Sequence, residues 1–301
     1  SAVGAVVRPG VDVALRPAGF EWIAPLLGMA DRQTSIDVRR ELAQRAIGAA
    51  RDPADLSKIG EFALSISDEL ASRAALAALE ASPIFPPARM LAAHVALRLG
   101  RPDDAGRALD DLAPDPRVHA LRAWVSYERG EWPTSSAVAE PELSDEPSLA
   151  TIVKPLRWVK AHGLNSGFGP SAGILSAKDK AELEAMAATT DLGPLVAFDA
   201  WLEAGEIQRA AMLARGWAEG GPARALRLGR IARLHGRLEQ AERSLRAASE
   251  GGTLIAMTLV ERVHVLVSLH RASEALTLLS RFPVLASTHQ PWLRALALAA
   301  S

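Results

Sequence analysis

Residues 228–248 read LGRIARLHGRLEQAERSLRAA, and this stretch decides how the rest of the chain is interpreted. A predicted helix runs to a turn at Gly236, and a second predicted helix carries a small residue, Ala241, five positions after the glycine. The same order recurs on both sides, with turns at Gly205, Gly236 and His270 followed by Ala210, Ala241 and Ala275. Three consecutive units of this kind within residues 194–281 indicate stacked pairs of helices.

The composition favours the same class of fold. Ala, Leu and Arg dominate, aromatic residues make up 5% of the chain, and β-branched residues show no sustained alternation. Ala, Leu and Arg have high helix propensity, whereas strands are enriched in β-branched and aromatic residues. We therefore predict an all-α protein.

The three units resemble tetratricopeptide repeats, which are two-helix units of about 34 residues with large and small residues at set places. The match is best around Gly236, and the residues that carry it are Leu228, Gly229, Ala241, Leu245 and Ala248. The neighbouring units supply Trp201, Ala210 and Pro222 before it, and Ala275, Leu279 and Phe282 after it. The turns are 31 and 34 residues apart, so the units are divergent. This resemblance implies a right-handed α-solenoid of antiparallel helix pairs.

Pro, Gly and acidic residues divide the chain into four predicted regions. Residues 1–35 are expected to form an irregular N-terminal cap, and residues 36–139 a first block of helical repeats with glycine turns at Gly100 and Gly130. Residues 140–175 are predicted to be a Pro- and Gly-rich loop with one connecting helix, and residues 176–301 a second repeat block.

Charge and cysteine content exclude several functions. The chain has no cysteine, which excludes disulfides and thiolate chemistry, and its net charge is −1. We therefore expect no binding to nucleic acid. No run of about 18 apolar residues occurs, so no membrane span is expected within the segment. The charge is uneven, however, because residues 206–301 carry 13 Arg and 7 Glu, a balance of +6, which leaves −7 for the remainder.

The candidate binding residues come from this basic part. Arg224, Arg227, Arg230 and Arg233 recur every three residues before Gly236, and Trp201 is the large residue of the preceding unit. Arginines bind carboxylates and phosphates, so these residues are predicted to contact an acidic partner. The alternative is that the arginines form a solvated face, since a step of three fans them around the helix.

The expected function is that of a non-catalytic scaffold, which binds an extended peptide or a helix of a partner protein in a solenoid groove. One alternative is a ligand-sensing or peptide-sensing regulatory segment of a larger bacterial signalling or transcription protein. A second is a helical enzyme, for which Glu261, His264 and His162 are the candidates. Glu261 and His264 have the spacing found in di-iron sites, but no second Glu-x-x-His occurs, so we interpret them as a hydrogen-bonded pair. No metal or cofactor is expected.

The compartment and origin are less constrained. The chain begins at Ser1, as expected of a segment excised from a longer protein, and its Ala- and Arg-rich composition is compatible with a bacterial origin. A cytoplasmic location is favoured, with an extracytoplasmic domain of an anchored protein as the alternative. The oligomeric state is not predicted.

Overall fold

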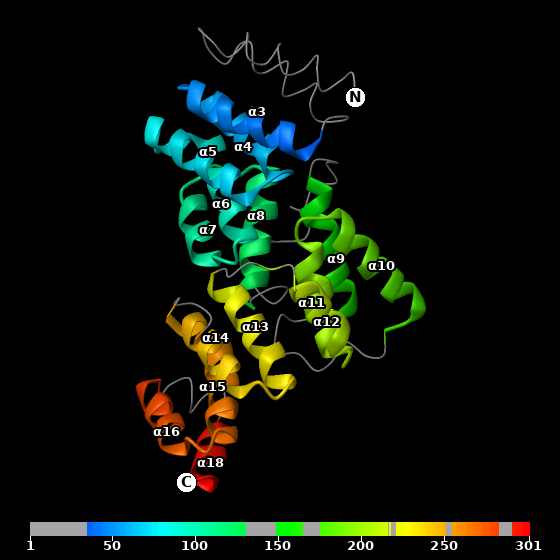
Figure 1. The fold of residues 1–301 in the computed structure, drawn as a ribbon, viewed down its shortest axis with the longest axis vertical. Helices are drawn as coiled ribbons and strands as arrows, with labels where there is room; N and C mark the ends of the chain where they lie inside the picture. Colours follow the sequence, from blue (N-terminus) through cyan, green and yellow to red (C-terminus); the bar gives the residue numbers. More distant parts are fainter. Residues whose placement is uncertain are drawn as a thin grey trace. The chain divides into compact units, whose positions relative to one another are not determined.

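The structure is a computed structural model that describes residues 35–130, 149–164, 175–215, 217, 221–250, 255–282 and 291–301 (Figure 1). Over these residues it contains fifteen helices and no strand, which confirms the all-α prediction. Residues 1–34 of the predicted cap, and residues 140–148 and 165–174 of the predicted loop region, lie outside the described residues.

The chain forms two compact units. The first consists of residues 1–98 and 104–113, and the second of residues 99–103 and 114–301. This division falls near the turn at Gly100, whereas the sequence places the main interruption between residues 140 and 175.

The first unit contains neighbouring helices that pack in sequence order. They are α3 (Ile36–Ala49), α4 (Pro53–Leu64), α5 (Asp68–Ala81) and α6 (Pro86–Arg98), and the unit also includes most of α7 (Pro102–Leu109). Ser35 caps α3 by accepting from the Val38 amide, and Asp37 lies in the first turn, where its charge favours the helix dipole. Asp52 caps α4 in the same way, and Pro53 occupies its first turn.

The second unit continues the pattern through ten helices of the described chain. They are α8 (Pro116–Glu128), α9 (Ala150–His162), α10 (Ala177–Thr189), α11 (Gly193–Glu203), α12 (Ile207–Ala214), α13 (Pro222–Leu234), α14 (Leu238–Glu250), α15 (Ile255–Ser268), α16 (Ala272–Arg281) and α18 (Pro291–Ala299). Consecutive helices pack on each other from α10 to α12 and from α13 to α16, and α13 also contacts α15 directly. No described helix is both long and apolar enough to cross a membrane.

The turns between paired helices use left-handed backbone, as the glycines predict. Gly205 and Gly236 have φ of 77° and 71°, and His270 takes the equivalent place with φ of 59°. Left-handed backbone costs a residue with a Cβ about 1–2 kcal/mol, which is why glycine is common at the end of a helix. His270 tolerates this conformation without the advantage that glycine has.

The small residues allow the paired helices to approach closely. Ala210, Ala241 and Ala275 are completely buried. A Cβ added to Gly229 on α13 would lie 2.6 Å from Cγ of Leu245 on α14, so the glycine leaves the space that the leucine fills. The bulky and small residues quoted for the repeat resemblance therefore explain how α13 packs on α14.

Candidate functional site

Helix α13 positions all four candidate arginines. Pro222 stands in its first turn with preset backbone φ, and the helix then runs uninterrupted to Leu234. The arginines point to different sides of the helix, as their three-residue spacing predicts: Arg227 contacts α8 and α11, which precede α13, and Arg230 and Arg233 contact α15, the second helix after it. Helix α13 is therefore tied electrostatically to neighbours on both sides.

Arg227 lies at the centre of a buried polar network. Its Nε and Nη2 donate to the carboxylate of Asp199 on α11, at 3.0 and 2.7 Å, and its Nη1 donates to Glu128 on α8 at 2.6 Å. The hydroxyl of Tyr127 donates to Asp199 at 2.8 Å, and the indole of Trp124 donates to Glu128 at 3.4 Å. All five side chains are buried. Each carboxylate thus has a cationic and a neutral donor.

The electrostatics of the network fix its protonation. Burial acts to lower the pKa of the Arg227 guanidinium, but the carboxylates of Asp199 and Glu128 outweigh burial and raise this pKa well above its usual value. Burial raises the pKa of the Tyr127 phenol well above 10.0, and the Asp199 carboxylate raises it further. Tyr127 therefore stays protonated at neutral pH, as its role as a donor requires.

Burial takes Arg227 out of the surface predicted for partner binding. Its side chain is 5% exposed and all three guanidinium nitrogens donate to protein oxygens. This arrangement also differs from the solvated face weighed as the alternative. Arg227 holds helices together, because two buried carboxylates without a cation would cost several kcal/mol each.

Arg230 and Arg233 together clamp one carboxylate. Their Nε atoms donate to Glu261 on α15, at 3.1 Å from Arg230 and 2.6 Å from Arg233. Among the described residues, the terminal nitrogens of both guanidinium groups have no protein acceptor. The side chains of Arg230 and Arg233 are 16% and 30% exposed, and that of Glu261 is 12% exposed. Two cations on one anion leave a local charge of +1, and the terminal guanidinium nitrogens can donate to a further acceptor.

An aromatic pair adjoins this clamp. His264 lies one turn after Glu261 on α15, and its ring is 5.2 Å from that of Trp292 on α18, tilted by 46°. Burial, and secondarily the charge of Arg233, lower the pKa of His264 below 6.5, while Glu261 opposes this change. The ring is therefore neutral at neutral pH. The hydrogen bond expected between Glu261 and His264 is replaced by those from the two arginines.

No protein-family model, curated protein or solved structure matches the chain.

The structure does not place the other two candidates beside the clamp. Trp201 is 2% exposed in α11, where the guanidinium of Arg209 lies 4.7 Å from the centre of its ring. The stem of Arg224 lies against Gly100, and the Gly100 carbonyl accepts from the Ala223 amide. Trp201 is thus a core residue, and Arg224 helps α13 begin against the turn at Gly100.

The enzyme candidates have separate sets of neighbours. His162 bonds to the Trp158 carbonyl at 2.9 Å and to Asp179 at 3.2 Å, and its ring stacks on that of Trp158. Glu261 and His264 belong instead to the clamp. Within the described ranges, no three His, Asp or Glu side chains could together hold a metal ion.

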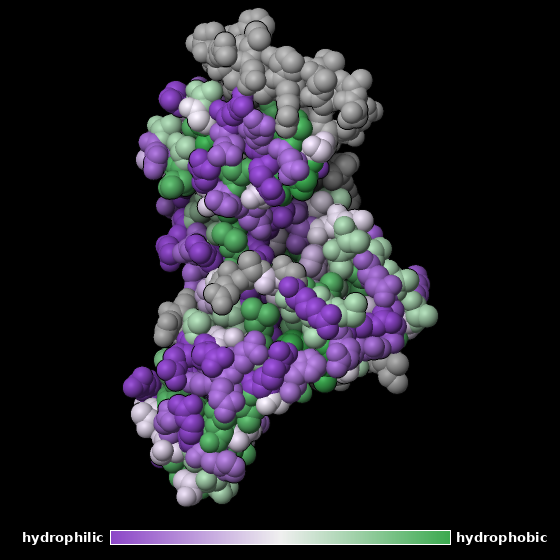
Figure 2. Space-filling model, in the orientation of Figure 1, coloured by the Kyte–Doolittle hydropathy of each residue, from purple (hydrophilic) through white to green (hydrophobic). Residues whose placement is uncertain are grey.

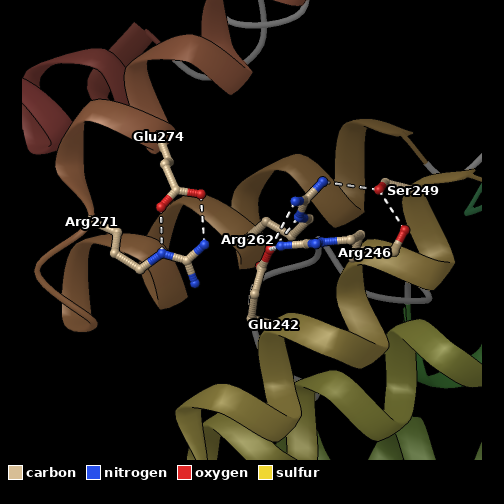
Figure 3. Close-up of polar contacts among 6 residues, drawn as sticks. All are labelled: Glu242, Arg246, Ser249, Arg262, Arg271 and Glu274. Carbon is tan, nitrogen blue, oxygen red and sulfur yellow. Dashed lines mark hydrogen bonds and ion pairs between the residues drawn. The ribbon is translucent and has the colours of Figure 1, made fainter.

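Sequence reasoning missed a second ionic cluster, on α14 and α15 (Figure 3). Glu242 is 3% exposed and accepts from Arg246 at 3.0 Å and from Arg262 at 2.9 Å. Arg262 also donates to Ser249 at 3.0 Å. The four-residue step from Glu242 to Arg246 was the available signal. On the face drawn in Figure 2, hydrophilic residues gather over α14 and α15.

Proposed function

We propose that this chain is a non-catalytic protein-interaction scaffold, a right-handed tetratricopeptide-like solenoid whose Arg230 and Arg233 bind an acidic side chain of a partner segment. The observation that supports the proposal is the clamp on Glu261. It fixes two guanidinium groups side by side and leaves their terminal nitrogens without protein acceptors among the described residues.

The chemistry of the clamp favours a carboxylate. A guanidinium group presents donors in a planar fork that matches two carboxylate oxygens, and hydrogen bonds to charged groups are worth about 1.5–3 kcal/mol. Glu261 already holds the Nε side of each fork, so little side-chain entropy is lost when a ligand binds. The local charge of +1 attracts an anion and becomes neutral when one carboxylate binds.

The position of the clamp favours a chain segment as the ligand. Arg230 and Glu261 belong to α13 and α15, the first helices of successive pairs, which contact each other directly. In helical-repeat proteins such a row of helices offers an extended surface for a peptide or helix. The net charge of −1 argues against a nucleic acid partner.

Selection from a displayed library of random peptides tests the proposal. The wild-type chain should enrich peptides that contain Asp or Glu, and the double variant Arg230→Gln, Arg233→Gln should lose this enrichment. Glutamine retains a donor for Glu261 but removes the charge. Arg243→Gln is the matched control, since Arg243 is an exposed arginine on α14. Equal enrichment by the double variant, with its melting temperature unchanged, would sink the assignment.

A further inference from the structure

Trp292 lies at the surface on helix α18, which packs against its neighbours through buried residues. Its neighbour Leu293 is completely buried, together with Ala297, in a core that includes Leu259 and Val263 of α15. Helix α18 is thereby fixed on α15 and α16, yet the indole of Trp292 remains 45% exposed. A large aromatic side chain kept half in solvent on a helix that is anchored by two buried residues is the kind of residue that anchors partners at interfaces.

The indole is continuous with the arginine clamp through His264. Glu261 and His264 are one turn apart on α15, so they lie on the same side of that helix. Arg233 bonds to Glu261 and is close enough to act electrostatically on His264, whose ring in turn lies against Trp292. The cationic donors and the aromatic surface therefore form one strip along α13, α15 and α18.

We propose that this strip binds two side chains of one partner segment, a carboxylate at Arg230 and Arg233 and an aromatic side chain against Trp292 and His264. The inference rests on the proposed function and adds to it the chemical class of the partner, an acidic segment that also carries an aromatic residue. The carboxylate of the segment is complementary in charge to the arginine end of the strip, and its aromatic side chain is complementary in hydropathy to the aromatic end. Preformed aromatic surfaces bind other aromatic rings at offset or tilted angles.

The neutral state of His264 suits this role. A charged imidazolium beside the indole would keep its water and weaken the apolar contact. The groups that face His264 are Arg233 on α13, Glu261 on α15 and Trp292 on α18. Of these, the charged ones offset each other at the imidazole, while burial leaves the ring uncharged.

Binding measurements on designed peptide pairs test the inference. The best peptide selected by the wild-type chain is synthesised in three forms: unchanged, with its acidic residues replaced by amides, and with its aromatic residues replaced by Ser. Isothermal titration should show that each replacement weakens binding by about tenfold, as expected for the loss of one well-made contact. Trp292→Ala should weaken the unchanged peptide by a similar factor and have little effect on the form that lacks aromatic residues.

Two further variants are controls for the specificity of the Trp292→Ala effect. Leu298→Ala removes another exposed apolar side chain of α18, 54% exposed, and should leave binding unchanged. Trp292→Phe keeps an aromatic face and should restore most of the affinity. If Trp292→Ala binds the unchanged peptide as tightly as wild type, the two-side-chain inference is overturned. The proposed function still stands in that case, provided that the amide form of the peptide binds weakly. If the amide form binds as well as the unchanged peptide, the proposed function fails too.

Discussion

Arg227 and Asp199, 28 residues apart in sequence, are joined inside the second unit by hydrogen bonds from both Nε and Nη2 of the guanidinium. Both side chains are nearly inaccessible to solvent. The pair ties α13 to α11, and the remaining nitrogen of Arg227 ties α13 to Glu128 on α8. An arginine that the sequence assigns to a binding surface is therefore the central cross-link of three helices.

Replacing Arg227 with Ala should destabilise the second unit by about 3–5 kcal/mol, because two buried carboxylates lose their only buried cationic partner among the described residues. Urea denaturation followed by circular dichroism measures the change. Arg243→Ala, at an exposed position, should stay within about 0.5 kcal/mol of wild type. A loss below about 1 kcal/mol for the Arg227 variant would mean that the carboxylates find other partners.

Tyr127 offers a direct probe of the same network, because it is the chain's single tyrosine. Its pKa is raised in the folded state, so the stability that it contributes is complete below the unfolded value of about 10 and is lost as pH rises above it. Tyrosinate absorbance should therefore appear at higher pH in the native chain than in urea. Tyr127→Phe should lose about 1–2 kcal/mol of stability at neutral pH and should remove this alkaline dependence. Identical native and denatured titration curves would contradict the burial of Tyr127.

Gly229→Ala should destabilise the pair formed by α13 and α14 by about 1–3 kcal/mol, although alanine has the higher helix propensity. The added methyl group would meet Leu245 at 2.6 Å. Gly48→Ala on α3 is the matched control, because a Cβ there has no neighbour within 4 Å. That variant should gain about 0.5–1 kcal/mol. Thermal unfolding of both variants separates the effect of packing from that of propensity, and a more stable Gly229 variant would refute the close approach.

His264 should make the second unit less stable in mild acid. Its folded pKa is lowered from 6.5, so its contribution is present above about pH 6.5 and is lost as pH falls through the folded value. His264→Gln should flatten the dependence of unfolding free energy on pH between about 7 and 5. The measurement is a series of urea titrations at constant ionic strength. An unchanged slope in the variant would assign the acid sensitivity to other groups.

The sequence predicts the local features of the repeats well, for a physical reason. A turn glycine, a small residue five positions later and a bulky residue one turn after that act over one helix pair, so Gly236, Ala241 and Leu245 can be recognised by spacing alone. Their burial and backbone angles in the structure agree with that interpretation.

The roles of the arginines do not follow from local sequence, because their partners are distant. Arg227 meets Glu128 across 99 residues and Arg230 meets Glu261 across 31, and no local pattern contains both members of either pair. A three-residue step places arginines on different sides of a helix, but it does not tell which side meets a neighbouring helix. Only the packing of the helix pairs in three dimensions determines that Arg227 is buried and that Arg230 and Arg233 form the clamp.

The carboxylates on both sides of α13 restrict the order in which the helix pairs can pack. Glu261 stands 34 residues after Arg227, the same interval that separates the turns at Gly236 and His270, so the two hold corresponding places in successive helix pairs. A second copy of α13 and α14 inserted beside the first would bring arginine against arginine where α11 and α15 now supply acid. The pairs are therefore not interchangeable. The charges on each pair determine which pairs can pack on either side of it.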